Sequence, residues 1–331
     1  MATVGPIVRI GLPYLPGDYD HPFLTAARDL HAEILISVGS LYRPDRGWLR
    51  APITAWTTRP ALDSAGFTAM VKFGGYRWTV EEYVERIVMN FAGDGMRDDG
   101  YDRALMPCPW SWWSPMDYCC EQAIAPDRAE VVRRIQMTVD SYVETLEALQ
   151  GWRDEGENTT PDPLPILQGR RPADYVTCAR ELAAAIDATD PCCCATGDPE
   201  DCEATWHRDR PGLPPLVGLG SVCTREATGP EGILGVRHAL DRELPPHVKI
   251  HAFGVKGELL ELPAFGSYAH RLQSVDSSAW DDASRHDANR IRREGDPDFS
   301  NSVQHKTAFM QRWFKSQRVT PQVPLFGVRK G

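Results

Sequence analysis

The sequence predicts an α/β protein of the (β/α)8 barrel class within a chain of 331 residues. Short apolar runs recur along the chain, turn residues follow each run, and helical patterns lie between them. Strands that alternate with helices form a parallel sheet, and eight such units most simply close into a barrel. A doubly wound open sheet is the alternative, but no Gly-x-Gly-x-x-Gly turn follows the first apolar run.

Eight apolar runs are the predicted strands. Each is a few residues long and mostly apolar, as expected for strands that are covered on both faces. They span Ile7–Leu12, Ile34–Val38, Ala61–Asp63, Leu105–Cys108, Leu164–Gln168, Leu216–Gly220, Lys249–Gly254 and Leu272–Asp276.

Three segments between these runs have helical patterns, namely Thr79–Phe91, Asp127–Leu149 and Pro172–Ile186. The first begins with a Thr that can cap the helix, and a Glu follows three residues later. Gln150–Pro163 is polar and rich in Pro and Gly, which predicts a loop. Residues 190–215 form a longer irregular insertion. Strand signals resume after both segments, so neither indicates a domain boundary.

The composition is that of a globular protein with a full core, with 42% hydrophobic and 25% charged residues. We expect a catalytic barrel over residues 1–284, including the insertion 190–215, and a basic extension over 285–331 that packs on the barrel. From Arg285 to Lys330 ten Lys and Arg stand against four Asp and Glu. The net charge of −10 argues against a protein that coats nucleic acid, although it does not exclude local binding. No apolar run reaches the roughly 18 residues of a membrane span, and no signal peptide is evident, which predicts a cytoplasmic protein.

Polar residues follow the predicted strands at the ends where a barrel carries its functional groups. Taken singly, each has a plainer role, because an Asp at a strand end often caps a helix and a Gly there serves a turn. Three carboxylates, an amide and a Gly-x-Gly segment on one face favour a site instead. The set comprises Asp63, Asp117, Gln168, Gly169, Gly218, Gly220, Ser221, Phe253, Gly254 and Asp276.

This set suits cleavage at an acetal-like carbon. One carboxylate attacks or stabilises an oxocarbenium-like centre, while a second moves a proton to or from the leaving group. A third carboxylate and a carboxamide can read the edge of a planar heterocycle. Tyr118, Phe67 and Phe253 have faces for stacking, although core packing is the usual role of aromatic residues.

Six ordered motifs resemble one known family. They are LDSAGF (Leu62–Phe67), MDYCCE (Met116–Glu121), ILQG (Ile166–Gly169), VGLGSVCTR (Val217–Arg225), HAFGVKG (His251–Gly257) and SVDSSAW (Ser274–Trp280). Together they resemble the tRNA-guanine transglycosylases, and most closely the DpdA-like branch of DNA-modifying 7-deazaguanine transglycosylases.

The resemblance implies a base exchange through a covalent intermediate. Asp276 matches the nucleophile that attacks C1′, and Asp63 matches the general acid and base that serves the departing and incoming bases. Asp117 and Gln168 match residues that hydrogen-bond the base. The expected base site also includes the backbone strip Gly218, Leu219 and Gly220 and the strand-end residues Gly169, Phe253 and Gly254.

The sequence departs from the tRNA enzymes in two ways. Those enzymes carry a zinc site after the nucleophile, with a Cys-x-Cys-x-x-Cys run and a later His, whereas no cysteine follows Cys223 here. No C-terminal RNA-binding domain is expected either, since only about fifty residues follow Asp276. Both departures favour DNA over tRNA as the polymer.

Nine cysteines without a secretion signal indicate reduced thiols or metal ligands rather than disulfides. Thiolates and an imidazole at close spacing in the insertion suit a structural Zn²⁺ ion, with Cys192, Cys194, Cys202 and His207 as ligands. A Cys-rich loop without metal is the other interpretation, because the spacing matches no known zinc pattern. No organic cofactor is expected.

The leading hypothesis is the replacement of guanine in DNA by a 7-deazaguanine such as preQ0, in the cytoplasm, or in the host cytoplasm if a phage encodes the protein. The same exchange on tRNA, a non-catalytic base-binding relative and a hydrolytic N-glycosidase are the alternatives. The basic extension is expected to contact phosphates. Its contact residues would be Arg285, Arg290, Arg292, Arg293, Lys306, Arg312 and Lys315.

Overall fold

The computed structural model describes residues 6–13, 22–45, 47–48, 60–85, 110–154, 160–189, 212–223, 225–255 and 271–317. Within these residues eight strands form one parallel sheet in the order β6-β5-β2-β1-β10-β9-β8-β7. The strands are β1 (Ile7–Leu12), β2 (Glu33–Ser37), β5 (Ala61–Asp63), β6 (Trp112–Trp113), β7 (Ile166–Leu167), β8 (Leu216–Leu219), β9 (Lys249–Ala252) and β10 (Leu272–Ser277). A separate hairpin pairs β3 (Tyr42–Arg43) with β4 (Gly47–Trp48).

The sheet curls into a barrel whose strands follow one another in chain order. Its two ends, β6 and β7, meet through the main chain, because the amide of Leu164 donates to the carbonyl of Trp113 at 2.7 Å. The indole Nε1–H of Trp113 adds a hydrogen bond to the carbonyl of Pro161 at 2.8 Å across the same seam. The predicted (β/α)8 class is confirmed.

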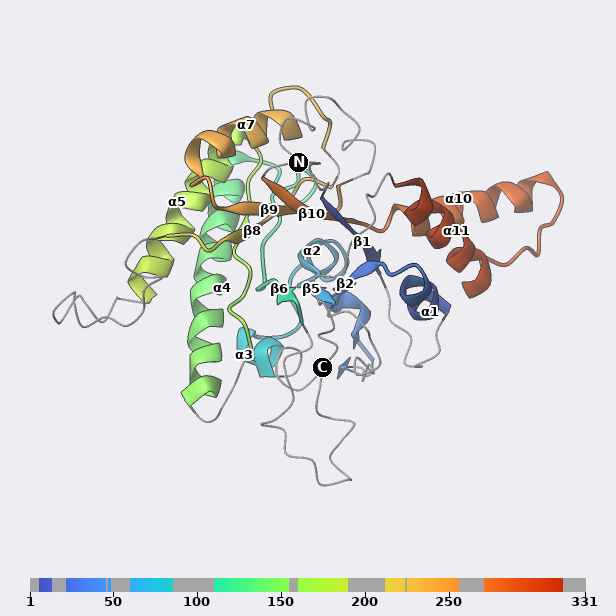
Figure 1. Ribbon diagram of the computed structural model, residues 1–331, viewed down its shortest axis with the longest axis horizontal. Helices are drawn as coiled ribbons and strands as arrows, with labels where there is room; N and C mark the ends of the chain where they lie inside the picture. Colours follow the sequence, from blue (N-terminus) through green and yellow to red (C-terminus); the bar gives the residue numbers. More distant parts are fainter. Residues whose placement is uncertain are drawn as a thin grey trace, which may run out of the picture.

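Helices surround the sheet (Figure 1). The group α4, α5 and α7 flanks one side, and α1, α10 and α11 flank the other. The helices are α1 (Pro22–Asp29), α2 (Gly66–Phe73), α3 (Val80–Tyr83), α4 (Arg128–Asp154), α5 (Pro172–Thr189), α7 (Ile233–Glu243), α10 (Ala279–Glu294) and α11 (Val303–Ser316).

Seven of the eight predicted strands coincide with barrel strands to within two residues at either end, and the predicted position of the fourth barrel strand is wrong. The structure uses Trp112–Trp113 in its place, whereas Leu105–Cys108 lies outside the described residues. The loop expected over Gln150–Pro163 is also wrong in its first part, because α4 continues through Asp154. Helix α4 continues beyond Leu149, where the predicted helix ends.

The first predicted helix begins as expected. Thr79 Oγ1 accepts a hydrogen bond from the amide of Glu82, and the Glu82 carboxylate accepts one from the amide of Thr79, both at 3.2 Å. This reciprocal pair satisfies two amides that would otherwise lack partners at the start of α3. Residues after 85 in this segment lie outside the described part of the chain.

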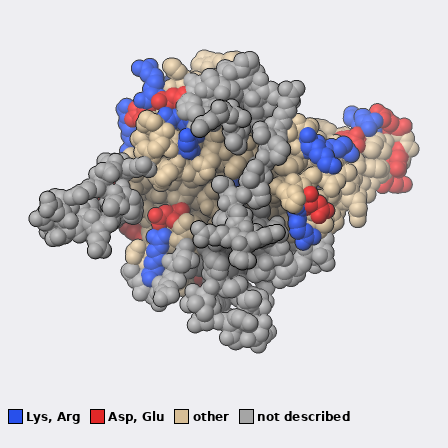
Figure 2. Space-filling model, viewed as in Figure 1, with Lys and Arg blue, Asp and Glu red and all other residues tan. Residues whose placement is uncertain are grey.

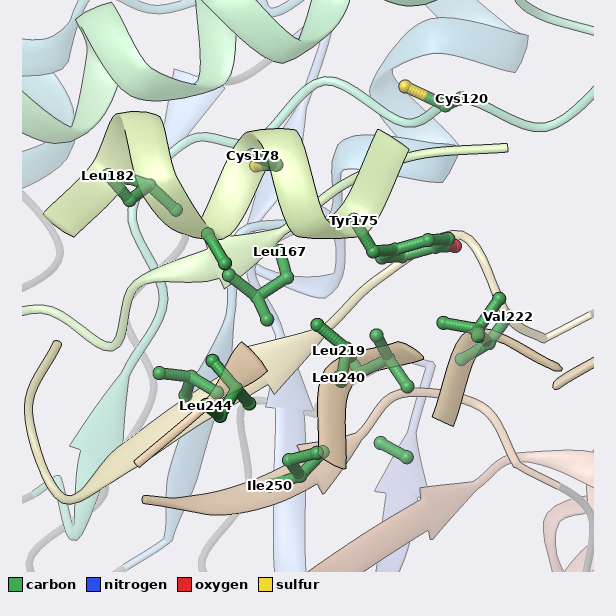
Figure 3. Close-up of a cluster of buried hydrophobic side chains, with 14 of the residues drawn as sticks. Cys120, Leu167, Tyr175, Cys178, Leu182, Leu219, Val222, Leu240, Leu244 and Ile250 are labelled. Carbon is green, nitrogen blue, oxygen red and sulfur yellow. The ribbon is translucent and has the colours of Figure 1, made fainter. Parts of the chain in front are cut away.

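Side chains alternate between the barrel interior and the helical layer, because a strand has a period of two. Outward residues such as Leu167, Leu219 and Ile250 pack under α5 and α7, with Tyr175 and Leu240 from those helices (Figure 3). The inward residues of several strands instead form a small central core. It consists of Leu35, Ala61, Trp112, Leu164 and Ile166, with Leu216 and Phe253 against it.

The described part of the chain ends with two helices. Helix α10 runs from Ala279 to Glu294, across residue 284, where the sequence predicts the junction between barrel and extension. Helix α11 lies beside both α10 and α1 (Figure 1). Among the described residues, no helix combines the length and apolar character needed to cross a bilayer.

Candidate functional site

A cavity of about 540 Å³ opens at the carboxyl ends of the strands. Its lining comes from the ends of the barrel strands and from the loops directly after them, which is where parallel barrels place their functional groups. The same alternation that fills the barrel core directs the last inward residue of each strand into this cavity. Asp63 ends β5, and Asp276 stands one residue before the end of β10.

Most of the predicted catalytic and base-site residues line this cavity. The carboxylates of Asp63, Asp117 and Asp276 line it together with Gln168. Gly220, Phe253 and Gly254 line it as well.

Three predicted base-site residues do not line the cavity. A Cβ on Gly169 would meet Asp174 and Tyr175 of α5, so this glycine serves the packing of strand against helix. A Cβ on Gly218 would meet Ile166 and Phe253, so that glycine lies in the barrel core. The side chain of Leu219 packs outward in the helical layer (Figure 3).

Asp117 and Gln168 form the centre of a buried hydrogen-bond chain. Gln168 Nε2–H donates to Asp117 Oδ2 at 2.5 Å, and Ser64 Oγ–H donates to Asp117 Oδ1 at 2.5 Å. The Tyr76 hydroxyl lies 3.0 Å from Ser64 Oγ and donates to the Asp117 carbonyl at 2.9 Å. A carboxylate oxygen has two lone pairs, so Asp117 retains acceptor capacity for a ligand.

The chain continues from Gln168 into the loop after β8. Ser221 Oγ lies 2.5 Å from Gln168 Oε1 and 3.0 Å from Glu121 Oε2, and its single proton can be donated to only one of them at a time. Ser221 has a φ of 54°, in the left-handed region that costs a non-glycine residue about 1–2 kcal/mol. Ala65, also in the lining, has a φ of 64°. Backbone strain at such positions accompanies functional sites.

Asp63 favours its protonated form. Burial raises the pKa of its carboxyl group to about 8, and the charges of Asp117 and Asp276 add to the rise. The amide of Ala65 donates to Asp63 Oδ2 at 3.2 Å and opposes this shift. Burial also raises the pKa of Asp117, to about 6, although hydrogen bonds from Ser64 and Gln168 oppose it. A group with a pKa near 8 can both hold and release a proton at neutral pH, which suits a general acid and base.

Two groups beneath the cavity contact the carboxylate of Asp276. The amide of Gly254 donates to Asp276 Oδ1 at 2.9 Å, and Nε2 of His251 lies 3.3 Å from the same oxygen. Gly254 has a φ of +65°, and a Cβ on it would meet the Cβ of Cys223 at 2.5 Å, so only glycine fits here. Among the described residues, Oδ2 of Asp276 has no hydrogen-bond partner and remains available to a ligand.

The sequence analysis missed several residues of the cavity. Arg43 on β3 and Lys72 on α2 are exposed side chains in its lining, and Glu121 is a buried one. Glu121 stands within one of the six motifs, but no motif includes Arg43 or Lys72. His251, beneath the cavity, also stands within a motif. The sequence feature that could have identified it is a polar residue at an inward position of a strand.

Three of the predicted phosphate-contact residues, Arg285, Arg290 and Lys306, form ion pairs with carboxylates among the described residues. Arg290 pairs with Asp287 and Glu294, and Arg285 pairs with Asp281 and Asp282. Lys and Arg are accordingly intermixed with Asp and Glu on the α10–α11 lobe (Figure 2).

The remaining extension residues differ in their contacts. Lys306 pairs with Asp281, Arg292 and Arg293 donate to main-chain carbonyls, and Arg312 lies over the ring of Phe309. Lys315 is exposed on α11. Their role in phosphate binding stays a prediction.

The predicted zinc ligands Cys192, Cys194, Cys202 and His207 lie outside the described residues. Within the described ranges, no group of His, Cys, Asp and Glu has the arrangement of a metal site. The structural zinc ion therefore stays a prediction.

Comparison with known families adds an independent line of evidence. Residues 31–190 match the model of the DpdA family, DeoxyPurine in DNA protein A. This match confirms the resemblance to the DpdA-like branch. It covers Asp63, Asp117 and Gln168 but ends before Asp276, whose assignment therefore depends on the geometry of the cavity. The curated proteins contain no significant match to the chain.

The close approach of Gly220 to Gln168 yields a stability prediction. A Cβ on Gly220 would lie 2.3 Å from Gln168 Nε2, so Gly220→Ala should displace an amide that bonds Asp117 and Ser221. We expect a loss of about 1–3 kcal/mol in the free energy of unfolding, measured by urea denaturation. Gly75→Ala is the matched control, because its Cβ meets nothing within 4 Å, and it should change stability by less than about 0.5 kcal/mol. Equal effects of the two variants would contradict the tight packing.

The raised pKa of Asp63 predicts a pH dependence of stability. The folded state retains this proton up to a pKa of about 8, whereas the unfolded state releases it near the ordinary aspartate pKa of 3.8. The unfolding free energy contributed by this group therefore falls as pH rises between these two values. Asp63→Asn should remove about one proton from the pH dependence of unfolding between pH 6 and 8. Asp127→Asn, at the exposed cap of α4, should leave the slope of the unfolding free energy against pH unchanged. A slope for Asp63→Asn equal to that of the wild type would contradict the raised pKa.

Proposed function

We propose that this protein is a transglycosylase that exchanges guanine in DNA for a 7-deazaguanine, with Asp276 as nucleophile and Asp63 as general acid and base. The observation that carries the proposal is one cavity shared by a carboxylate, whose Oδ2 has no hydrogen-bond partner among the described residues, and a carboxyl group with a raised pKa. The DpdA match supports guanine transglycosylation, and the family description supports a deoxypurine in DNA as the target. The reaction in the cytoplasm and the choice of preQ0 remain predictions.

The first half-reaction removes guanine. Oδ2 of Asp276 attacks C1′ of the deoxyribose as the bond from C1′ to N9 breaks, and the neutral carboxyl group of Asp63 gives its proton to the departing base. The product is a glycosyl ester of Asp276 and an ionised Asp63. The ester must be kept from water, which a cavity filled by a base accomplishes.

The second half-reaction reverses these roles. The incoming 7-deazaguanine gives its N9 proton to Asp63, and N9 attacks C1′ as the ester bond breaks and Asp276 regains its charge. Asp117 and Gln168 are the groups proposed to hold the base in both halves. Their positions between Ser64 and Ser221 leave them little freedom to move.

The target base must leave the duplex stack to enter a cavity at the barrel mouth. The flanking phosphates then pass near the cavity rim. Arg43 and Lys72 are exposed there and, among the described residues, no ion pair engages either of them. We assign the nearest phosphate contacts to this pair, while α11 of the basic extension is a second candidate surface.

The covalent intermediate is the decisive prediction. Incubation of the wild-type protein with end-labelled guanine-containing DNA should give a protein–DNA adduct on a denaturing gel, and Asp276→Asn should abolish it. Label from a 7-deazaguanine base should enter DNA and not tRNA. Asp63→Asn should slow exchange by about 10²–10⁴-fold, because the variant cannot transfer a proton to the base.

Asp282→Asn is the matched control for this experiment, since Asp282 is an exposed carboxylate on the helix that follows Asp276. It should retain full activity. Incorporation into tRNA alone would overturn the choice of polymer, and release of guanine without incorporation would indicate a hydrolase. Absence of an adduct together with absence of any base release would indicate a binding protein.

The rim cations predict a change in the salt dependence of DNA binding. Arg43→Gln with Lys72→Gln should weaken binding to a guanine-containing single strand and flatten the plot of log Kobs against log salt concentration, by about 0.7 for each phosphate that the variant no longer binds. Fluorescence anisotropy over a salt series measures both quantities. Arg312→Gln with Lys315→Gln removes the same charge from α11. A rim variant that binds like the wild type would contradict the rim assignment, and an unchanged α11 variant would contradict the predicted role of the extension.

A further inference from the structure

A buried histidine lies directly beneath the candidate nucleophile. His251, on β9, has no exposed side-chain surface. Its ring lies against Trp112 and Phe253, with ring centroids 4.6 Å and 4.5 Å away. Two aromatic neighbours at this distance fix the plane of the imidazole ring. The reaction outlined above leaves this titratable side chain without a role.

The two ring nitrogens of His251 face two residues of β10. Nδ1 lies 2.7 Å from Ser274 Oγ, and Nε2 lies 3.3 Å from Oδ1 of Asp276. Ser274 stands opposite His251 in the register of the two strands, and Asp276 is two residues further along. Because strand side chains alternate, Ser274 and Asp276 both point inward, one above the other.

The contact to Asp276 falls short of full hydrogen-bond geometry, and no other described residue provides Nε2 with a partner. A buried ring N–H without an acceptor carries a penalty of about 1–3 kcal/mol. Catalytic hydrogen bonds are often long in the absence of substrate and shorten when the complex forms. Asp276 Oδ1 is therefore the acceptor toward which this nitrogen is directed.

The surroundings select the tautomer of the neutral ring. Burial lowers the pKa of His251, and the nearby charge of Arg9 adds to this effect, whereas Asp276 opposes it. With the proton on Nδ1, the lone pair of Nε2 would face the carboxylate of Asp276, which is repulsive. With the proton on Nε2, the Ser274 hydroxyl donates to Nδ1 and both contacts are favourable.

We propose that His251 is a positioning residue that, with the main-chain amide of Gly254, holds Oδ1 of Asp276 and thereby presents Oδ2 to C1′ of the nucleotide. This inference rests on the proposed function of Asp276. Both donors face the same oxygen, so a rotation of the carboxylate would break the hydrogen bond from Gly254 and lose the contact with Nε2.

A neutral donor suits a carboxylate that must attack and later depart. It orients the carboxylate without the full charge of a cation, which would reduce its nucleophilicity. Arg9, a buried cation whose charge acts on Asp276, is paired with Glu33 at 2.9 Å. When the ester bond from Oδ2 to C1′ breaks in the second half-reaction, negative charge returns to the carboxylate, and the two donors to Oδ1 stabilise it.

The test compares two substitutions at His251. His251→Gln retains an N–H donor at the position of Nε2, whereas His251→Leu retains bulk and removes the donor. We expect His251→Leu to lower kcat for base exchange about 10²-fold, with KM for the incoming base changed less than about threefold, because misplacing a reacting atom affects chemistry rather than binding. His251→Gln should recover most of kcat. An unchanged kcat in the Leu variant, or a Gln variant no better than Leu at equal stability, would overturn the proposal.

A second measurement does not depend on activity. In protein labelled with ¹⁵N-histidine, the His251 signal, assigned by its disappearance in His251→Gln, should report a neutral ring with the proton on Nε2. Asp276→Asn should shift that signal, because the carboxylate no longer accepts the proton. An unshifted signal would overturn the contact. A shifted signal in a protein that performs no base exchange would retain the contact and reject the proposed function instead.

Discussion

The crowding of carboxyl groups in one cavity is the constraint on which the site depends. Asp63, Asp117 and Asp276 line one cavity, and carboxyl groups that lie close together in a buried site do not all remain ionised. Asp63 takes the proton, since burial and the other two charges raise its pKa to about 8. A division into one proton holder and one nucleophile thus follows from the arrangement itself.

The barrel interior stabilises this arrangement from below. The layer beneath the cavity contains the Arg9–Glu33 pair and the His251–Ser274 contact, where a barrel usually has branched aliphatic residues. Arg9 also lies over the ring of Trp112, 5.5 Å from its centroid. Here the layer ends on Oδ1 of Asp276, so its geometry acts directly on the proposed nucleophile.

Much of the fold was predictable because seven barrel strands are apolar runs bounded by turn residues. The fourth strand was not, because Trp112–Trp113 is only two residues long and its neighbours are Ser and Pro, so no period is visible. Leu105–Cys108 is simply the more apolar segment nearby. A short strand in a barrel is defined by its partners, in this case β5 and the main chain at Leu164, and the sequence contains no sign of such pairing.

The residues of the site likewise fall into those that the sequence predicts and those that it does not. Asp63, Asp117, Gln168 and Asp276 lie at strand ends or in motifs, where their chemistry is visible from sequence. Arg43 and Lys72 reach the same cavity from a hairpin and a helix face, and only the folded chain brings them there.

For the basic extension, a count of charged residues predicts more unpaired charge than the described residues show. A count of its Arg and Lys residues alone suggests a surface of unpaired charge. The spacing of Arg290 three residues after Asp287 and four before Glu294 already indicates pairing along a helix.

An exchange of bases places a demand on the cavity that hydrolysis does not. The departing and incoming bases must occupy the same place in turn, so the groups that hold them have to keep their geometry while the cavity empties and refills. The hydrogen-bond chain from Tyr76 through Ser64, Asp117 and Gln168 to Ser221 meets this demand, since each member is held by the next. Its two ends are fixed to the main chain at Asp117 and Cys120. A base site that the protein's own hydrogen bonds hold in place favours capture of a second base over entry of water, and this preorganisation is the structural argument for transfer.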